Sequence, residues 1–453
     1  MMLRPNLFLH RFRTGIVWPV LIFAIAGITV PQSRAQDAET YEFPPLNYSK
    51  SKPHDAVTRL QAELVSGQVK LEGTDREVVQ SLLHALHVPV SSQMLVFSKT
   101  SFQKDIISPK HPRALFYTDD CYVGWVPGGL VEIAAIDPTL GPVFYSFDPR
   151  GLSEKKRPEF PRDDDCMRCH GGTFVRGIPG VFSRSLYTDK SGEPIFREGS
   201  EVVDYQTPFT ERWGGWYVTG LHGITLHRGN VFASETAEKL VFDPVRGANV
   251  TNLSSYFEVE NYLTNSSDIV SLLVFEHQTS MQNVLTRAGM DCRHMLQYQK
   301  DLEAALKPAP VPDADGLSFD SVRSVFDDSA GKVVDALLFK DEARLPKTLT
   351  GSAAFQKDFS AATPHDRNGD SLKDLLLSEH LFKNRCSYLI YSDSFRSLPG
   401  QLKSRIYAHL SRALDPDHPD SRYAYIGQEE RRRIATILTE TLPEFNERAL
   451  TTK

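Results

Sequence analysis

The sequence feature that most constrains the fold is a helical repeat of apolar residues that begins near Asp268 and continues to about Leu306. Residues three and four positions apart lie on one face of an α-helix, so a repeat at this spacing predicts a long helix with one face turned inward. The inward face comprises Ile269, Leu272, Leu273, His277, Met281, Val284, Leu285 and Ala288.

The residues before this helix have a different pattern. From about Met94, short runs of β-branched and aromatic residues alternate with Gly, Pro and Asp, which predicts strands joined by turns. The predicted strands are 94–97, 114–117, 122–126, 131–136, 143–147, 181–187, 193–197 and 213–219. Two helices are predicted before the strands, over 54–65 and 74–87, and Thr74 and Glu77 form a capping box at the start of the second.

Shorter helical patterns follow the long helix, over 317–326, 371–382, 398–414 and 428–442. We therefore expect an α+β fold with a β-rich N-terminal half and a mainly α-helical C-terminal half, rather than a small all-α protein. The predicted organisation is a signal peptide (1–35), a loose leader (36–53), a β-rich region (54–262) and a helical region (263–453).

The first 35 residues have the pattern of a secretory signal peptide. Three arginines precede 16 uncharged, mostly apolar residues from Gly15 to Val30, and Ser33 and Ala35 stand at positions −3 and −1 of a cleavage site. A membrane anchor is the alternative, but a span needs about 20 apolar residues. The pattern favours export with cleavage before Gln36, and therefore no stable membrane span in the mature protein.

The charge of the mature chain excludes some partners. Removing residues 1–35 takes away four of the 51 basic residues and none of the 57 acidic ones, so the net charge falls from −6 to −10. Phosphates repel a chain this acidic, which argues against nucleic acid and anionic membrane surfaces as partners. A protein partner with a basic face is the natural expectation.

One pentapeptide predicts a cofactor. Cys166-Met-Arg-Cys169-His170 is a C-x-x-C-H sequence, the pattern at which haem c is attached. Two thiols on one turn can each add to a vinyl group of the porphyrin, and the next residue, His170, is then placed to ligate the iron as the proximal ligand. The pattern predicts one covalent haem c, carried in the β-rich half, and it agrees with export because bacterial c-type maturation takes place outside the cytoplasm.

Two other interpretations of the pentapeptide are a zinc half-site and a redox dithiol. A structural zinc site usually needs four ligands, and no second C-x-x-C or H-x₃₋₅-H lies within the usual distance. A thioredoxin-like dithiol is expected in a βαβ setting, which the neighbouring sequence does not have. The haem interpretation is therefore preferred.

With this motif the chain resembles c-type cytochromes. Segments 122–125, 163–171, 211–220 and 385–392 look like a group of large exported bacterial monohaem proteins labelled "cytochrome c domain", and not like the small helical class I cytochromes with an axial Met. The resemblance implies a haem-bearing extracytoplasmic protein, periplasmic in a bacterium. It implies no settled activity.

A six-coordinate iron would need a distal ligand from elsewhere in the chain. His222 and His227 follow an aromatic strand in a Gly-rich stretch where a loop can approach a haem, and His227 is the first choice. His277 and Met281 are four apart on the inward face of the long helix, where core packing is the more usual role. An iron with no distal ligand from the protein is the remaining alternative.

Other residues near the motif have possible supporting roles. Arg176 and Arg184 lie within fifteen residues of His170 and could bind the haem propionates, although solvated arginines are an equal alternative. Pro179 or a nearby Gly could accept a hydrogen bond from the second ring nitrogen of His170. The remaining cysteines, Cys121, Cys292 and Cys386, can form at most one disulfide among themselves, and buried free thiols are expected.

Three functions fit these observations. The first is electron transfer through one covalently bound haem, with a redox protein as partner. The second is a haem oxidoreductase that acts on peroxide or a nitrogen oxide at an open iron face, which would account for a chain much larger than a carrier needs. The third is a binding or sensory protein in which the haem is structural.

Overall fold

An antiparallel six-stranded sheet organises the first half of the computed structural model, which describes residues 39–152, 158–235, 239–306, 311–361 and 363–445. The order across the sheet is β5-β4-β3-β2-β1-β8. The strands are β1 (Met94–Val96), β2 (Arg113–Tyr117), β3 (Cys121–Trp125), β4 (Val131–Asp137), β5 (Gly141–Phe147) and β8 (Trp216–Tyr217). The five strands predicted between 94 and 147 are confirmed, each within two residues at both ends.

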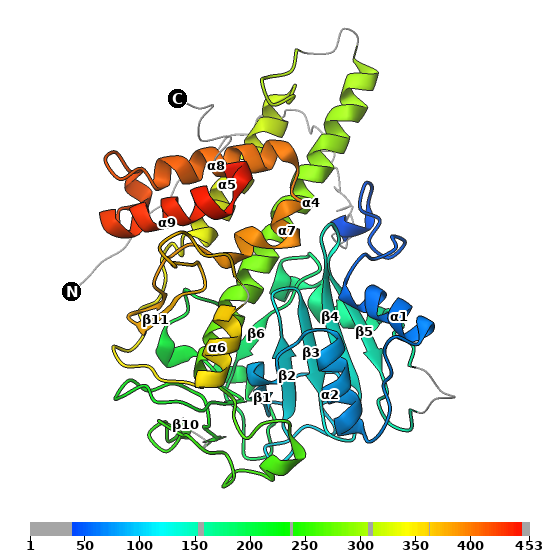
Figure 1. Ribbon diagram of the computed structural model, residues 1–453. Coiled ribbons are helices and arrows are strands. Elements are labelled where there is room, and N and C mark those ends of the chain that lie inside the picture. Colours follow the sequence, from blue (N-terminus) through cyan, green and yellow to red (C-terminus); the bar gives the residue numbers. More distant parts are fainter. Residues whose placement is uncertain (1–38, 153–157, 236–238, 307–310, 362, 446–453) are drawn as a thin grey trace, which may run out of the picture. The chain divides into compact units, whose positions relative to one another are not determined.

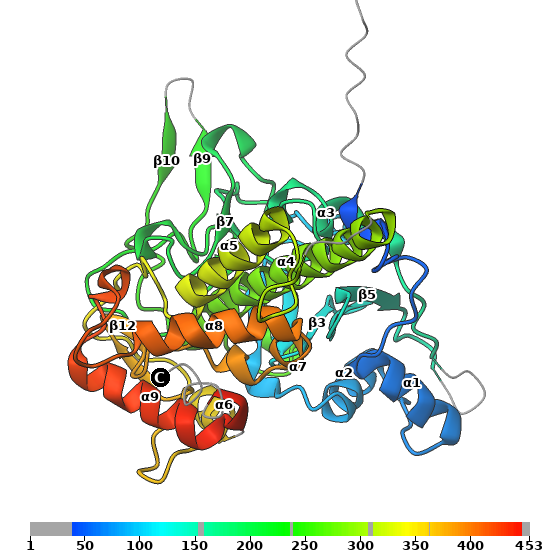
Figure 2. The same cartoon turned by 90° about the horizontal axis from the view of Figure 1, so that it is seen from above.

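The two faces of this sheet are covered by different helices. One face packs on α1 (Ala56–Ser66) and α2 (Asp75–Ala85), where Phe116, Val123 and Ile133 share an apolar cluster with the helices. The opposite face packs on α4 (Ile269–Ala305), and the rings of Tyr117 and Tyr122 contact Phe275 of that helix. Figure 2 shows the sheet between the two sets of helices.

The long helix predicted from Asp268 is confirmed. Asp268 caps α4, because its carboxylate accepts a hydrogen bond from the backbone N–H of Ser271 at 3.0 Å. The residues of the predicted inward face are buried apart from Val284, which is half-buried. The apolar contacts of α4 join the sheet to the helices of the second half.

The second half is mainly helical, as predicted. Alongside α4 lies α5 (Asp320–Leu337), and α8 (Gly400–Ala413) packs on α5 (Figure 1). The other helices of this half are α6 (Ala353–Ala361), α7 (Asp393–Arg396) and α9 (Gln428–Thr441). The helices predicted over 398–414 and 428–442 are confirmed, and the one predicted over 317–326 extends to Leu337. The helix predicted over 371–382 is wrong: these residues contain the strands β11 (Leu375–Ser378) and β12 (His380–Phe382).

Two small antiparallel pairs complete the first half. They are β6 (Ser183–Ser185) with β7 (Glu201–Val203), and β9 (Ala233–Glu235) with β10 (Leu240–Phe242). The strand predicted over 193–197 is reduced to a single bridge between Thr188 and Pro194. The fold is therefore α+β, with a β-rich N-terminal half and a helical C-terminal half.

The predicted domain organisation differs from the structure in two respects. Residues 39–53, expected to be part of a loose leader, pack against the sheet: Tyr41 and Tyr48 are buried, and the Tyr48 hydroxyl donates to the Pro142 carbonyl at 2.7 Å. Residues from 39 onward form one compact unit, so 54–262 and 263–453 are regions of that unit. The predicted signal peptide, 1–35, lies outside the described residues. Among those that are described, no helix is both long and apolar enough to span a membrane.

Candidate functional site

The C-x-x-C-H segment is attached to the edge of the sheet through β5. Arg162 forms an isolated bridge with Tyr145, and the Asp163 backbone N–H donates to the Phe144 carbonyl at 2.9 Å. The Ser146 hydroxyl donates to the Asp163 carboxylate at 2.8 Å. These bonds direct the motif onto the face of the sheet that α4 covers, where α3 (Met167–His170) is seen in Figure 2.

The two cysteines of the motif lie on one helical turn. Asp163 caps the turn by accepting from the Asp165 backbone N–H at 3.1 Å, and a short 3-10 helix, Asp164–Cys166, continues directly into α3. Cys166 is half-buried and Cys169 is exposed, and both are free thiols. The arrangement presents both sulfur atoms from the same turn, as attachment to one macrocycle requires.

His170 is fixed by a reciprocal pair of hydrogen bonds with Gly180. The His170 Nδ1 lies 2.8 Å from the Gly180 carbonyl, and the Gly180 backbone N–H donates to the His170 carbonyl at 2.8 Å. A carbonyl only accepts, so Nδ1 carries the proton and Nε2 has the free lone pair. Burial lowers the pKa of His170 to about 4, which keeps the ring neutral at neutral pH.

Three further side chains, two of them distant in sequence, hold His170 and its hydrogen-bond partner in place. The rings of Phe144 and Phe182 lie 4.6 and 5.0 Å from the imidazole, centroid to centroid. Asn283 of α4 makes two bonds with Val181, the neighbour of Gly180: it donates to the carbonyl at 2.7 Å and accepts from the N–H at 3.0 Å. The long helix therefore positions the segment whose Gly180 carbonyl accepts the hydrogen bond from His170 Nδ1. The sequence pattern did not reveal this contact between α4 and the motif.

Burial and negative charge both act on the Cys166 thiol. Burial and, to a smaller extent, the negative charges of Asp163 and Glu132 raise the pKa of Cys166 to about 12, although the positive charge of Arg113 acts in the opposite direction. The thiol is therefore protonated at neutral pH. Glu132 and Arg113, which belong to strands of the sheet, are close enough to influence the motif electrostatically.

Of the two arginines predicted near a propionate, the structure brings Arg184 to the motif. Its guanidinium lies 4.4 Å over the ring of Phe174, which in turn contacts Phe182 beside His170. Nε and Nη2 donate to the Ser200 hydroxyl at 2.9 and 2.6 Å, and neither bond uses Nη1. Arg176 is exposed, and its carbonyl accepts from Arg287 of α4.

The preferred distal ligands, His227 and His222, are engaged elsewhere. His227 Nδ1 accepts from the Gly229 backbone N–H at 3.0 Å, which uses the single lone pair of a neutral imidazole. His222 accepts from the Asn249 backbone N–H at Nε2 and donates from Nδ1 to the Thr225 carbonyl. Both rings pack against Phe209, and among the described residues no ring contact or hydrogen bond joins either to the motif. This geometry argues against both as ligands.

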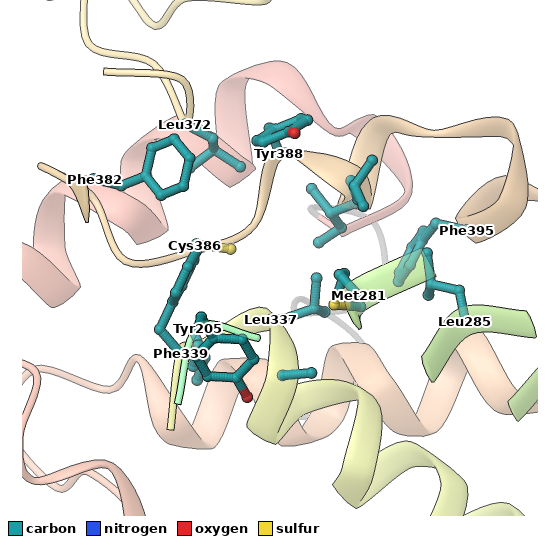
Figure 3. Close-up of a cluster of buried hydrophobic side chains, with 14 of the residues drawn as sticks. Tyr205, Met281, Leu285, Leu337, Phe339, Leu372, Phe382, Cys386, Tyr388 and Phe395 are labelled. Carbon is teal, nitrogen blue, oxygen red and sulfur yellow. The ribbon is translucent and has the colours of Figure 1, made fainter. Parts of the chain in front are cut away.

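His277 and Met281 have core roles. His277 Nε2 lies 2.8 Å from the Ser387 hydroxyl, and its ring stacks on Phe339 at 4.2 Å. Met281 is fully buried, and Figure 3 shows it in the apolar cluster with Leu337 and Leu285. Both observations favour the packing role over ligation.

Burial of His277 makes the stability of the fold depend on pH. Burial lowers its pKa to about 3, whereas an unfolded histidine titrates near 6.5. The unfolded chain therefore binds this proton first, and the contribution of His277 is complete above pH 6.5 and is lost as the pH falls below it. From pH 7 to pH 5 we expect wild type to lose about 2 kcal/mol more unfolding free energy than His277→Gln. Urea unfolding of both proteins at the two pH values measures this, and equal losses would contradict it.

The remaining cysteines are buried free thiols, as expected. Cys121 lies on β3, Cys292 on α4 and Cys386 just before Ser387, and all three are unpaired. In the part of the chain that the structure describes, no group of three or more His, Cys, Asp or Glu side chains could hold a metal ion.

Comparison of the chain with protein-family models, with curated proteins and with solved structures gives no match.

Proposed function

We propose that this protein is an exported c-type haem protein that transfers electrons through one covalently bound haem. Cys166 and Cys169 would form the thioethers, and His170 would give its Nε2 lone pair to the iron. When bound, the haem supplies a one-electron redox centre. The observation that carries the proposal is the reciprocal bonding of His170 and Gly180, because it leaves Nε2 as an unprotonated donor next to two free thiols on one turn.

The residues around the motif fit such a group. A metal-bound imidazole usually donates its other ring N–H to a carbonyl or carboxylate, which fixes the ring and its tautomer, and Gly180 provides that acceptor. Phe144 and Phe182 exclude water from the sides of the imidazole. Arg184, half-buried near Cys169, is a cation of suitable type for a propionate.

The decisive experiment is expression of the full chain in a bacterium with c-type maturation, followed by a haem stain of the denatured mature protein. Covalent haem retained on the gel and a sharp α-band on reduction are the expected results. A periplasmic fraction that contains the protein without its first 35 residues would support export. A colourless mature protein would refute the proposal.

A second candidate, an oxidoreductase with an open iron face, is favoured by one observation. The lone pairs of His222 and His227 are used by backbone N–H groups, and Met281 is enclosed in the core. If these residues do not ligate iron, an open face could bind peroxide or a nitrogen oxide. High-spin ferric iron that binds cyanide rapidly would favour the enzyme, and low-spin iron would favour electron transfer.

For the same reason, we expect His222→Ala, His227→Ala and Met281→Leu to leave the iron coordination of the holoprotein unchanged. Optical and paramagnetic resonance spectra of the three variants should overlay those of wild type, because none of these side chains offers its donor atom to the motif. A variant that changes the spin state would identify the distal ligand and contradict this expectation.

The partner we propose is a redox protein with a basic face, because the chain itself carries a net negative charge.

A further inference from the structure

A pair of opposite charges lies on the face of the sheet that carries the motif. Arg113 of β2 and Glu132 of β4 approach to 2.7 Å between Nη2 and Oε2, and their side chains are 20% and 14% exposed. The Arg113 Nε is buried and makes no hydrogen bond with the described residues. A largely buried ion pair is costly to remove from water, and this one leaves a guanidinium N–H without an acceptor, so packing alone does not account for its position.

Gly124 of β3 makes this pair possible. The register aligns Leu115, Gly124, Glu132 and Ser146 across the sheet. Arg113 crosses the central strand at Gly124, where a Cβ atom would lie 2.3 Å from the Arg113 Nη2. The guanidinium therefore occupies the space above a residue without a side chain and reaches the carboxylate two strands away.

The row of residues that holds Glu132 leads directly to the motif. Ser146, the cross-strand neighbour of Glu132, donates to Asp163, which caps the turn bearing Cys166. The charge of Glu132 raises the pKa of Cys166 and the charge of Arg113 lowers it, and Arg113 also lowers the pKa of His170. Ser146 and Asp163 thus connect the strand position of Glu132 to the turn that bears Cys166.

We infer that Arg113 and Glu132 set the reduction potential of the redox centre attached at this motif. This inference rests on the proposed function. A negative charge near an iron favours the oxidised state and a positive charge favours the reduced state, so the two residues act in opposite directions. Neither residue would ligate the iron, so each would act on the reduction potential only through the electric field of its charge.

The test is the midpoint potential of the purified holoprotein and of three variants. Glu132→Gln, which keeps the size of the side chain, should raise the potential by about 59 mV, equivalent to a tenfold change in the reduction equilibrium constant. Arg113→Met should lower it by a similar amount. The double variant should return toward wild type, because the two changes cancel.

Glu430→Gln is the matched control. Glu430 pairs with Arg385 in the helical half at 2.7 Å, with side chains 13% and 10% exposed, so its burial resembles that of Glu132. The midpoint potential of the Glu430→Gln variant should equal that of wild type. Urea unfolding of each purified holoprotein gives the structural cost of each substitution separately.

Two outcomes would overturn the inference, and they are distinguishable from each other. Covalent haem with unchanged or same-direction potentials, alongside a loss of stability, would make the pair purely structural. Absence of covalent haem from wild type would refute the proposed function and this inference with it. If Arg113→Met does not fold, Glu132→Gln is sufficient as a test, because the inference predicts that this variant alone has a higher midpoint potential than wild type.

Discussion

Replacing Cys166 and Cys169 together with alanine is expected to abolish covalent haem attachment completely. The structure presents both sulfur atoms on one turn, Cys169 exposed and Cys166 half-buried, and no other cysteine is near the surface in the described part of the chain. Thioether formation requires these thiols, so no other residue can substitute for them. The measurement is the haem stain of the denatured protein, with the ratio of haem absorbance to protein as the quantitative readout.

Cys386→Ala is the matched control for that variant. Cys386 is a fully buried free thiol in the core of the helical half, so the substitution removes a cysteine without touching the motif (Figure 3). Its haem ratio should equal that of wild type. Far-ultraviolet circular dichroism of the double variant separates loss of attachment from loss of fold. Haem retained through denaturation in the folded double variant would show that attachment occurs elsewhere.

Local signals explain which parts of the fold were predictable. The capping box predicted for Thr74 and Glu77 is present in the structure, and the long helix begins where the apolar repeat indicated, directly after Asp268. The alternation of strand and turn residues located the strands of the sheet in the same way. Such signals depend only on neighbouring residues, so one sequence contains them completely.

The segment 371–382 shows where local signals mislead. Ser371 and Asp374 bond to each other as in a helix cap, and three leucines follow, which together resemble the start of a helix. The backbone instead turns at Leu377 and Glu379, which have φ values of 56° and 64°, and β11 pairs with β12. The Glu379 carbonyl accepts from the Leu345 N–H, a long-range bond that no local pattern reveals.

The candidate site divides along the same line. The motif and a Gly carbonyl as acceptor for His170 could be anticipated, because Gly180 is only ten residues away. Phe144 and Asn283 could not, because their places beside the motif depend on the sheet edge and on the passage of α4. The sequence did contain a signal for Arg113 and Glu132. Charged residues within apolar strands are unusual, and they indicate that the strand faces another charged or polar group at that position.

Arg212→Met is expected to lower the unfolding free energy by about 3–5 kcal/mol, the largest stability effect we predict. Arg212 is 2% exposed and Glu276 of α4 is fully buried, with 2.6 Å between the Arg212 Nη1 and the Glu276 Oε2. Arg212 also donates to the carbonyls of Thr207 and Tyr205. Removing the guanidinium would leave a buried carboxylate and two carbonyls without their donors, and it would cut a polar link between the β-rich half and α4.

Urea unfolding at pH 8 measures this effect, and two further variants identify its cause. Burial raises the pKa of Glu276 to about 7, because loss of water outweighs the attraction of Arg212. Without Arg212 this pKa should rise further, so at pH 8 the variant must either bury an unpaired charge or take up a proton. Arg212→Met combined with Glu276→Leu should recover much of the loss, since it removes the unpaired group. Lys332→Met, which breaks the exposed pair with Asp328, should change stability by less than about 0.5 kcal/mol. If Arg212→Met were as mild as Lys332→Met, the buried pair would not be holding α4 to the β-rich half.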